Sequence, residues 1–181
     1  SINPVLHRKL GYDPVADFAA VSLIGTAPSL LSLHPSLPVR NVKELIDAAK
    51  ARPGQLTFAS SGVGTAPHLA GELFNTLAGV RLVHVPYRGG GPAFVDLIAG
   101  QVAMYFAGIS AALPFVKDGK LRGIAVTAAQ RSAAMPEMPT IAESGLPGYE
   151  VSNWYAIVTV VGTPKEIIAR LNYELVKALA A

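Results

Sequence analysis

One arrangement occurs three times in the middle of this 181-residue chain: an apolar strand, a Gly-rich turn and the start of a helix. The three copies read LTFASSGVGTAPHLAGEL, LVHVPYRGGGPAFVDLI and QVAMYFAGISAALPFV. Strands that alternate with helices through short turns predict an α/β fold with a parallel or mixed sheet. In such sheets ligands bind beyond the carboxyl ends of the strands, and all three turns are expected there.

Each of the three turns leads into a helix N-terminus, which carries unsatisfied N–H donors and a partial positive charge. Three such ends side by side predict a rim that holds a carboxylate or a phosphate group. Simple close packing of turn and helix, without a ligand, is the alternative interpretation. No residue set with obvious catalytic chemistry accompanies the turns, so the pattern favours capture of a small anion without turnover.

The flanking pattern gives further expectations for the fold. We expect two short strands, Val21–Ile24 and Leu30–Leu33, separated by a Gly/Pro break. Asn41 followed by Glu44 has the spacing of a capping box and predicts a helix that Pro53-Gly54 stops. Thr163 and Glu166 have the same spacing, with Pro164 at the first helical position, and predict a helix to the end of the chain.

The helices after the three turns are expected to begin at good N-terminal residues. Thr65 is a suitable N-cap, Pro92 starts the second helix and Ser110 caps the third. The buried stripe of the first helix is expected to be Leu69, Leu73 and Leu77. A short helical piece is expected around residues 141–144.

Composition excludes several classes of function. The formal charge is +3, from 15 basic and 12 acidic residues that are scattered along the chain, so no basic face predicts nucleic-acid binding. The absence of cysteine excludes disulfides, thiol nucleophiles and thiolate metal sites. The longest apolar run, Tyr155–Val161, is far shorter than the ~20 residues of a membrane span.

The turns do not carry the known nucleotide or hydrolase motifs. Gly62-Val63-Gly64 lacks the third glycine of a dinucleotide fingerprint, and no Gly-Lys-Ser/Thr of a P-loop occurs. Ser60, Ser61 and Ser110 are possible nucleophiles, but none lies in a G-x-S-x-G motif. The four scattered histidines form no His-x-x-x-His pair, so neither a metal nor another cofactor is expected.

Several side chains near the turns have two open interpretations. His68 either points at the cleft or caps and packs its helix, and His84 alternates within an apolar strand as a core histidine would. Arg88, the cation in a candidate loop, either faces a ligand carboxylate or is solvated. Tyr87 is either a hydrogen-bond donor over the cleft or a lid over the core, and Asp96 is interpreted as structural because it would repel an anion.

Motifs along nearly the whole chain resemble one family, the extracytoplasmic solute receptors of tripartite tricarboxylate transporters, often called Bug or TctC proteins. In sequence order they are Tyr12-Asp13-Pro14, Pro35-Ser36-Leu37-Pro38, Pro53-Gly54, Ser60-Ser61-Gly62-Val63-Gly64-Thr65 with His68-Leu69, His84-Val85-Pro86-Tyr87-Arg88-Gly89, Glu143-Ser144-Gly145, Trp154 and Gly162-Thr163-Pro164. These motifs occur in the same order as in the family, and together they make the resemblance specific. No single motif would be specific by itself.

The resemblance implies a type II periplasmic-binding-protein-like α/β fold, with two lobes that each contain a mainly parallel sheet. Residues 1–39 would be part of the first lobe and the hinge, residues 40–153 the complete second lobe, and residues 154–181 the return hinge and a helix of the first lobe. The first lobe is expected to be incomplete here. The implied location is periplasmic, with the signal peptide not in this chain.

By the same resemblance, the protein would capture a small carboxylate by lobe closure and pass it to the membrane subunits of its transporter, without membrane insertion of its own. A di- or tricarboxylate or an aromatic carboxylate is favoured, because the last turn reads Ala107-Gly108-Ile109 where many relatives have an acidic residue or Asn. Residues from the family pattern and from the turns together give this expected ligand site: Ser60, Ser61, Gly62, Gly64, Thr65, His68, Tyr87, Arg88, Gly89, Ala107 and Gly108.

Two alternatives remain at this point. The first is an α/β hydrolase or transferase that acts on a carboxylated substrate, with His68 as the base beside Ser60 or Ser61. The second is a structural or regulatory module without ligand binding, against which the rim of free N–H groups argues only weakly.

Overall fold

The fold was obtained as a computed structural model that describes residues 3–6 and 8–180. The chain divides into two compact units: Ala27–Asn153 form one, and Ser1–Thr26 with Trp154–Ala181 form the other. We describe each unit by itself, beginning with the larger one because it contains the three repeated turns.

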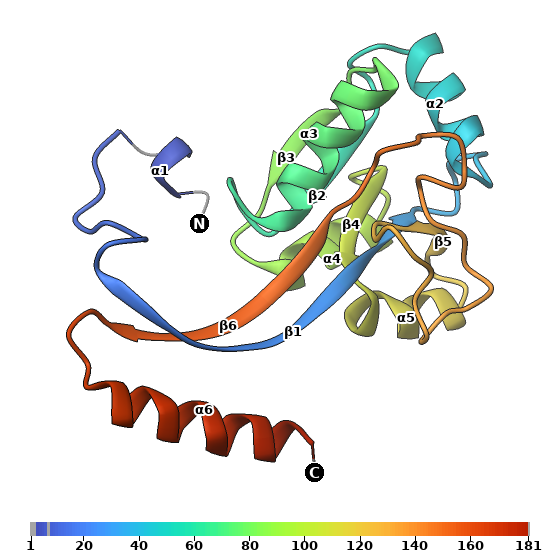
Figure 1. Cartoon of the computed structure of the whole chain (residues 1–181). Helices are drawn as coiled ribbons and strands as arrows, with labels where there is room; N and C mark the ends of the chain where they lie inside the picture. Colours follow the sequence, from blue (N-terminus) through green and yellow to red (C-terminus); the bar gives the residue numbers. More distant parts are fainter. Residues whose placement is uncertain (1–2, 7, 181) are drawn as a thin grey trace. The chain divides into compact units, whose positions relative to one another are not determined.

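The larger unit is built on a mixed sheet with the strand order β3-β2-β4-β1-β5 (Figure 1). β2 lies parallel to both β3 and β4, whereas β1 lies antiparallel to β4 and β5. Four of the five strands therefore point the same way. The strands are β1 (Phe18–Leu33), β2 (Thr57–Ser60), β3 (Val83–Pro86), β4 (Met104–Gly108) and β5 (Arg122–Val126).

Helices cover both faces of this sheet (Figure 1). Side chains of successive strand residues point to opposite faces, so Phe106 packs with α2 and α3 while Tyr105 packs with α4 and α5. Both faces are buried, which is why the strands read as nearly continuous apolar runs. The helices are α2 (Val42–Ala51), α3 (Ala66–Ala78), α4 (Gly90–Ile98) and α5 (Ile109–Lys117). The α/β fold expected from the sequence is thus confirmed.

The smaller unit contains the first part of β1, the strand β6 (Ser152–Val160) that pairs with it, and the helices α1 (Asn3–Leu6) and α6 (Lys165–Leu179). The amide of Asn172 on α6 donates to the backbone carbonyl of Val21 on β1 at 2.7 Å. Most of the large apolar side chains of β6 and α6 are exposed, including Trp154 and Tyr173.

The expected break between two short strands at residues 25–29 was wrong, because β1 is one strand of 16 residues. Pro28 does not interrupt it: pairing with β4 begins only at Ser29 and pairing with β5 at Leu30. Proline is tolerated in a strand where no ladder hydrogen bond requires its N–H.

The expected leucine stripe of α3 was also wrong. Its buried face is formed by Ala70, Gly71, Phe74 and Ala78, while Leu77 is exposed. The helical spacing is the same but is shifted by one residue, because the small residues allow α3 to lie directly against the ring of Phe58.

Several expected helix boundaries also need correction. α4 begins at Gly90 rather than at Pro92, and α5 begins at Ile109 with Gly108 at its N-cap position, so Ser110 is not the cap. Residues 141–145 form a hydrogen-bonded turn instead of a helical piece. Pro164 occupies the N-cap position of α6, and Thr163 donates to the carbonyl of Val160.

Candidate functional site

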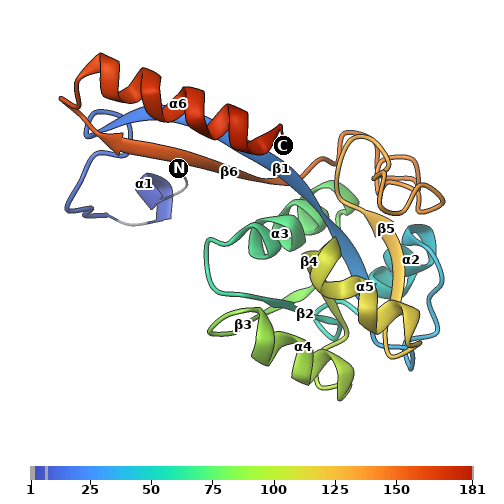
Figure 2. The same ribbon diagram turned by 90° about the horizontal axis from the view of Figure 1, so that it is seen from below.

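The N-termini of α3, α4 and α5 lie at one edge of the sheet in the larger unit. These helices directly follow β2, β3 and β4, which are neighbours and run in the same direction. The turns after β2 and β3 lie next to each other (Figure 2), and the N–H of Gly89 donates to the carbonyl of Ser61 at 3.2 Å. We call this edge, formed by residues 60–68, 87–91 and 107–111, the rim.

No side chain caps any of the three rim helices. α2, whose N-terminus is not at the rim, has a side-chain cap: Asn41 accepts from the N–H of Glu44 at 2.9 Å, and Glu44 accepts from the N–H of Arg40 just before the helix at 2.8 Å. A helix leaves its first N–H groups unsatisfied unless a cap, water or a ligand accepts them. The rim therefore offers several backbone donors where the partial positive ends of three helices meet.

The first turn folds on itself through its own polar groups. The Ser60 hydroxyl accepts from the N–H of Gly62 at 3.1 Å, and the Thr65 hydroxyl donates to the carbonyl of Gly62 at 2.7 Å. Gly64 has φ +80°, a conformation that favours glycine, and its N–H donates to Nδ1 of His68 at 3.1 Å. The N–H groups of Gly62 and Gly64 thus shape the turn, and donors for a ligand must come from other positions.

Ser60, His84 and His68 form a connected cluster behind this turn. The Ser60 hydroxyl lies 2.6 Å from Nε2 of His84, and its side chain is fully buried. The His84 ring stacks on His68 with centroids 4.0 Å apart, and on Phe58 with centroids 5.0 Å apart. Burial lowers the pKa of His84, the nearby His68 lowers it further, and Glu72 opposes the shift. The cluster therefore favours neutral His84 as a partner of Ser60.

The second turn contains one engaged and one exposed polar side chain. The Tyr87 hydroxyl donates a hydrogen bond to the Asp96 carboxylate at 2.7 Å. Burial, and to a smaller extent this hydrogen bond, raises the pKa of Tyr87 to about 12. The Tyr87 hydroxyl proton is therefore already used in the hydrogen bond to Asp96. Arg88 is exposed and makes no ion pair within the described part of the chain. Gly89, at φ +107°, holds the N-cap position of α4.

Ala107 and Gly108 of the third turn offer backbone groups only. Ala107 is buried in the core, and Gly108 occupies the N-cap position of α5 directly after the strand. Neither residue can contribute a polar side chain. Contacts from this part of the rim would have to come from the first N–H groups of α5 or from the exposed side chain of Ser110.

Tyr105 lies next to the rim, and the sequence did not reveal its role there. It lies on β4 beneath the first two turns: its hydroxyl hydrogen-bonds the Ser61 side chain, and a Cβ at Gly90 would come within 3.4 Å of it. Burial raises the pKa of Tyr105, and the Ser61 hydrogen bond opposes the rise. The available signal was a phenol in an otherwise apolar strand that ends at the rim.

The structure thus places all the expected site residues at this edge, in different roles. Ser60 and the N–H groups of Gly62 and Gly64 are used within the first turn, and Tyr87 is paired with Asp96. Ser61 and Arg88 remain the side chains best placed to reach a ligand. In the described residues no group of three His, Asp or Glu side chains gathers as a metal site would require, and no helix is long and apolar enough to cross a membrane.

This architecture defines the class as a periplasmic binding protein fold. The chain matches the periplasmic binding protein BugD with a TM-score of 0.86 at 32% identity, over 97% of this chain and 58% of that one. It also matches Rpa4515 of R. palustris, solved with adipate, with a TM-score of 0.87 at 41% identity, over 93% and 56%. A third match is MatC from Rhodopseudomonas palustris with bound malate, with a TM-score of 0.86 at 32% identity, over 97% and 60%.

The family follows from the sequence. The model of the tripartite tricarboxylate transporter family receptor, TctC, matches residues 1–181, and the chain belongs to this family. The resemblance carried by the motifs is thereby confirmed. The chain spans about half the length of the curated relatives it matches, 54% and 53% of the first two.

Proposed function

We propose that this chain is the ligand-binding part of a periplasmic solute receptor that captures a small carboxylate at the rim without chemical conversion. The observation that carries the proposal is the contrast in capping. Within the larger unit, three helices that meet at the carboxyl ends of adjacent strands lack side-chain caps, whereas α2, whose N-terminus is not at the rim, has one. Adipate and malate in the related structures are dicarboxylates, which is the ligand chemistry that such a rim favours.

The same proposal assigns residues 40–153 to the second lobe and the flanking segments, residues 1–39 and 154–181, to the first lobe and hinge. Micromolar affinity requires about 8 kcal/mol. One helix N-terminus supplies about 0.3–1 kcal/mol and a charge-assisted hydrogen bond about 1.5–3 kcal/mol, before the cost of association. The rim of the second lobe alone therefore leaves little margin, and closure of the first lobe would supply the remaining contacts. The loaded receptor would then engage the membrane subunits of its transporter.

The enzyme alternative is weakened for Ser60, one of its two candidate nucleophiles, by burial. Ser60 does lie within hydrogen-bond distance of a histidine, but that histidine is His84 rather than His68. The Ser60 side chain is fully buried, and its hydroxyl also bonds the backbone of Gly62. This buried and hydrogen-bonded hydroxyl is therefore poorly placed to attack a substrate at the rim. Prolonged incubation with adipate or malate, followed by NMR, is expected to return the carboxylate unchanged.

The variant Gly91→Asp tests the rim directly. Gly91 is exposed in the first turn of α4, and a Cβ there would meet no atom within 4 Å. The new carboxylate would favour the helix N-terminus, so stability is expected to stay equal or rise. The same charge would repel an anionic ligand, so the affinity for adipate or malate in calorimetric titration is expected to fall at least tenfold.

Gln130→Glu is the matched control, because it adds the same charge at an exposed loop position outside the rim. It is expected to leave affinity unchanged. Equal carboxylate binding by wild type and Gly91→Asp would refute the rim as the binding site. Micromolar or tighter binding by this 181-residue chain alone would refute the part of the proposal that requires lobe closure.

A further inference from the structure

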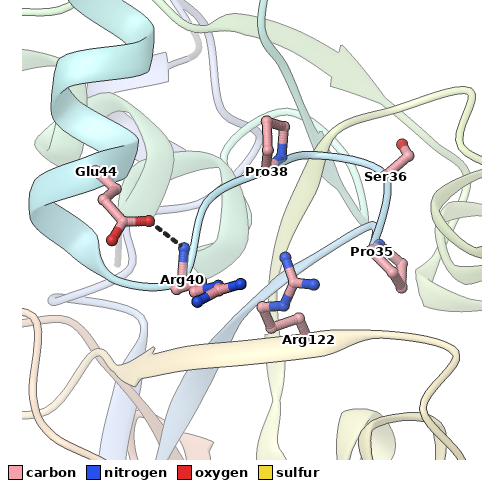
Figure 3. A pocket seen from close by; sticks show the side chains of 6 residues that line it. All are labelled: Pro35, Ser36, Pro38, Arg40, Glu44 and Arg122. Atoms are coloured by element: carbon pink, nitrogen blue, oxygen red, sulfur yellow. Dashed lines mark hydrogen bonds between the residues drawn. The ribbon is translucent and has the colours of Figure 1, made fainter.

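A second polar pocket lies in the larger unit at the edge of the sheet opposite the rim (Figure 3). Arg122 is the first residue of β5 and pairs with Leu33 at the end of β1, which also faces Met104 at the start of β4. The pocket therefore lies at the amino ends of β4 and β5, whereas the rim lies at the carboxyl ends of β2, β3 and β4. The pocket is lined by Pro35, Ser36, Pro38, Arg40, Glu44 and Arg122. It includes most of the Pro35–Pro38 motif, which has no part in the rim.

Arg122 is held in place by the segment that forms one wall of this pocket. Its Nη1 donates to the carbonyl of Leu37 at 3.0 Å and to the carbonyl of Val39 at 2.9 Å. A guanidinium has five N–H donors, so one nitrogen fixes the side chain while other donors remain for a further acceptor. No carboxylate within the described residues pairs with Arg122. The result is a half-buried, pre-positioned cation without a counter-charge.

Arg40 provides a second cation on the same pocket. Figure 3 shows its side chain extending from the start of α2 toward Arg122. In the described part of the chain the Arg40 side chain makes neither a hydrogen bond nor an ion pair. Two guanidinium groups that face one pocket repel each other unless an anion lies between them.

Glu44, the carboxylate that lines the pocket, is committed to capping α2. Its Oε2 accepts from the backbone N–H of Arg40 and its Oε1 from the Asn41 side chain, both at 2.8 Å. The pocket lining therefore carries two positive charges and one negative charge. Because arginine binds planar or tetrahedral oxyanions through paired N–H groups, this lining suits an oxyanion rather than a cation.

We propose that Arg40 and Arg122 form a second anion-binding pocket, separate from the rim, that accepts one carboxylate or phosphate group. This goes beyond the proposed capture of a transported carboxylate, because the pocket is at the opposite edge of the sheet. Two sources carry this chemistry: a free inorganic anion, or an acidic side chain of a partner protein that docks here.

The test is NMR titration of the ¹⁵N-labelled chain at constant ionic strength, with inorganic phosphate in one arm and the peptide acetyl-Gly-Glu-Gly-amide in the other. Saturable shifts are expected for the backbone amides of Ser36 and Arg40 and for the side-chain Nε of Arg122. Arg40→Gln is expected to weaken this binding at least fivefold. Arg81→Gln, which removes the same charge at an exposed position outside the pocket, is expected to stay within twofold of wild type.

A second variant, expected to bind the anion more tightly than wild type, controls for nonspecific loss of binding. Glu44→Gln retains a residue suited to the capping box but removes the negative charge, so it is expected to bind at least twofold more tightly. Tighter binding of the peptide would identify a partner's acidic side chain as the source, and tighter binding of phosphate would identify a free anion. The proposal is overturned if shifts do not saturate, if they are confined to rim amides, or if Arg40→Gln binds like wild type.

Discussion

Gly71 is the position where one added methyl group should perturb the fold most. An ideal Cβ at Gly71 would lie 2.1 Å from Cε2 of Phe58 and 2.5 Å from its Cδ2 and Cζ. The Phe58 ring is fully buried, stacks on His84 and packs edge-on against Phe106. The ring cannot move aside without disturbing both neighbours, so Gly71→Ala must either displace Phe58 or push α3 away from the sheet.

Two opposing effects set the magnitude for Gly71→Ala. Overpacking a well-packed core costs about 1–3 kcal/mol, and the rigid, enclosed ring places this site at the upper end. Alanine gains about 1 kcal/mol over glycine within a helix. The net loss in the free energy of unfolding is therefore about 2 kcal/mol, which lowers the melting temperature of a chain of this size by about 4–8 °C.

Urea and thermal unfolding followed by circular dichroism would measure this loss. Gly91→Ala is the matched control: it lies in α4 and its Cβ meets nothing within 4 Å, so it should be as stable as wild type or up to about 1 kcal/mol more stable. The double variant Gly71→Ala/Phe58→Leu removes the clashing ring, so it should be less destabilised than the sum of its two single variants. A Gly71→Ala protein as stable as wild type, or a strictly additive double variant, would refute the reasoning.

Two other predictions concern the capped helix and the histidine cluster. Asn41→Ala removes the acceptor for the N–H of Glu44 and should lower the free energy of urea unfolding by about 1 kcal/mol, whereas Lys43→Ala on the exposed face of α2 should change it by less than about 0.5. Because the pKa of His84 is lowered from 6.5 in the fold, the unfolded chain binds a proton first, and stability should fall as the pH decreases from about 6.5 toward the folded pKa. His84→Gln should reduce this slope in urea titrations across pH 7 to 5, and an unchanged slope would contradict the assignment.

The sequence was informative wherever a local rule determined the structure. The three strand–turn–helix repeats place the rim correctly, and the capping box at Asn41 and Glu44 forms as its spacing predicts. The regularities involved are short in range, since a capping box spans four residues and a Gly-rich turn only a few. Each could therefore be recognised without knowing what packs against it.

The expectations that failed depended on contacts between distant segments. The buried face of α3 depends on Phe58 on β2, because α3 packs against this ring with the small residues Ala70 and Gly71 rather than with its leucines. β1 remains continuous through Pro28 because its pairing with β4 and β5 begins only after that residue. The role of Tyr105 likewise depends on turns that the chain brings together from two other repeats. Periodicity alone cannot supply these partners.

The difference between α2 and the rim helices connects stability with the proposed function. A cap such as that of α2 satisfies an N–H group permanently and stabilises the fold by about 0.5–2 kcal/mol. At α3 the N-cap residue Thr65 could do the same, but its hydroxyl donates to Gly62 instead, and at α4 and α5 the N-cap residues are glycines without a side chain. The chain thus gives up cap stabilisation at the three helices that meet at the rim. Under the proposed function, the free energy available from satisfying those N–H groups is left for the bound anion, and binding and folding stability would be coupled at this edge.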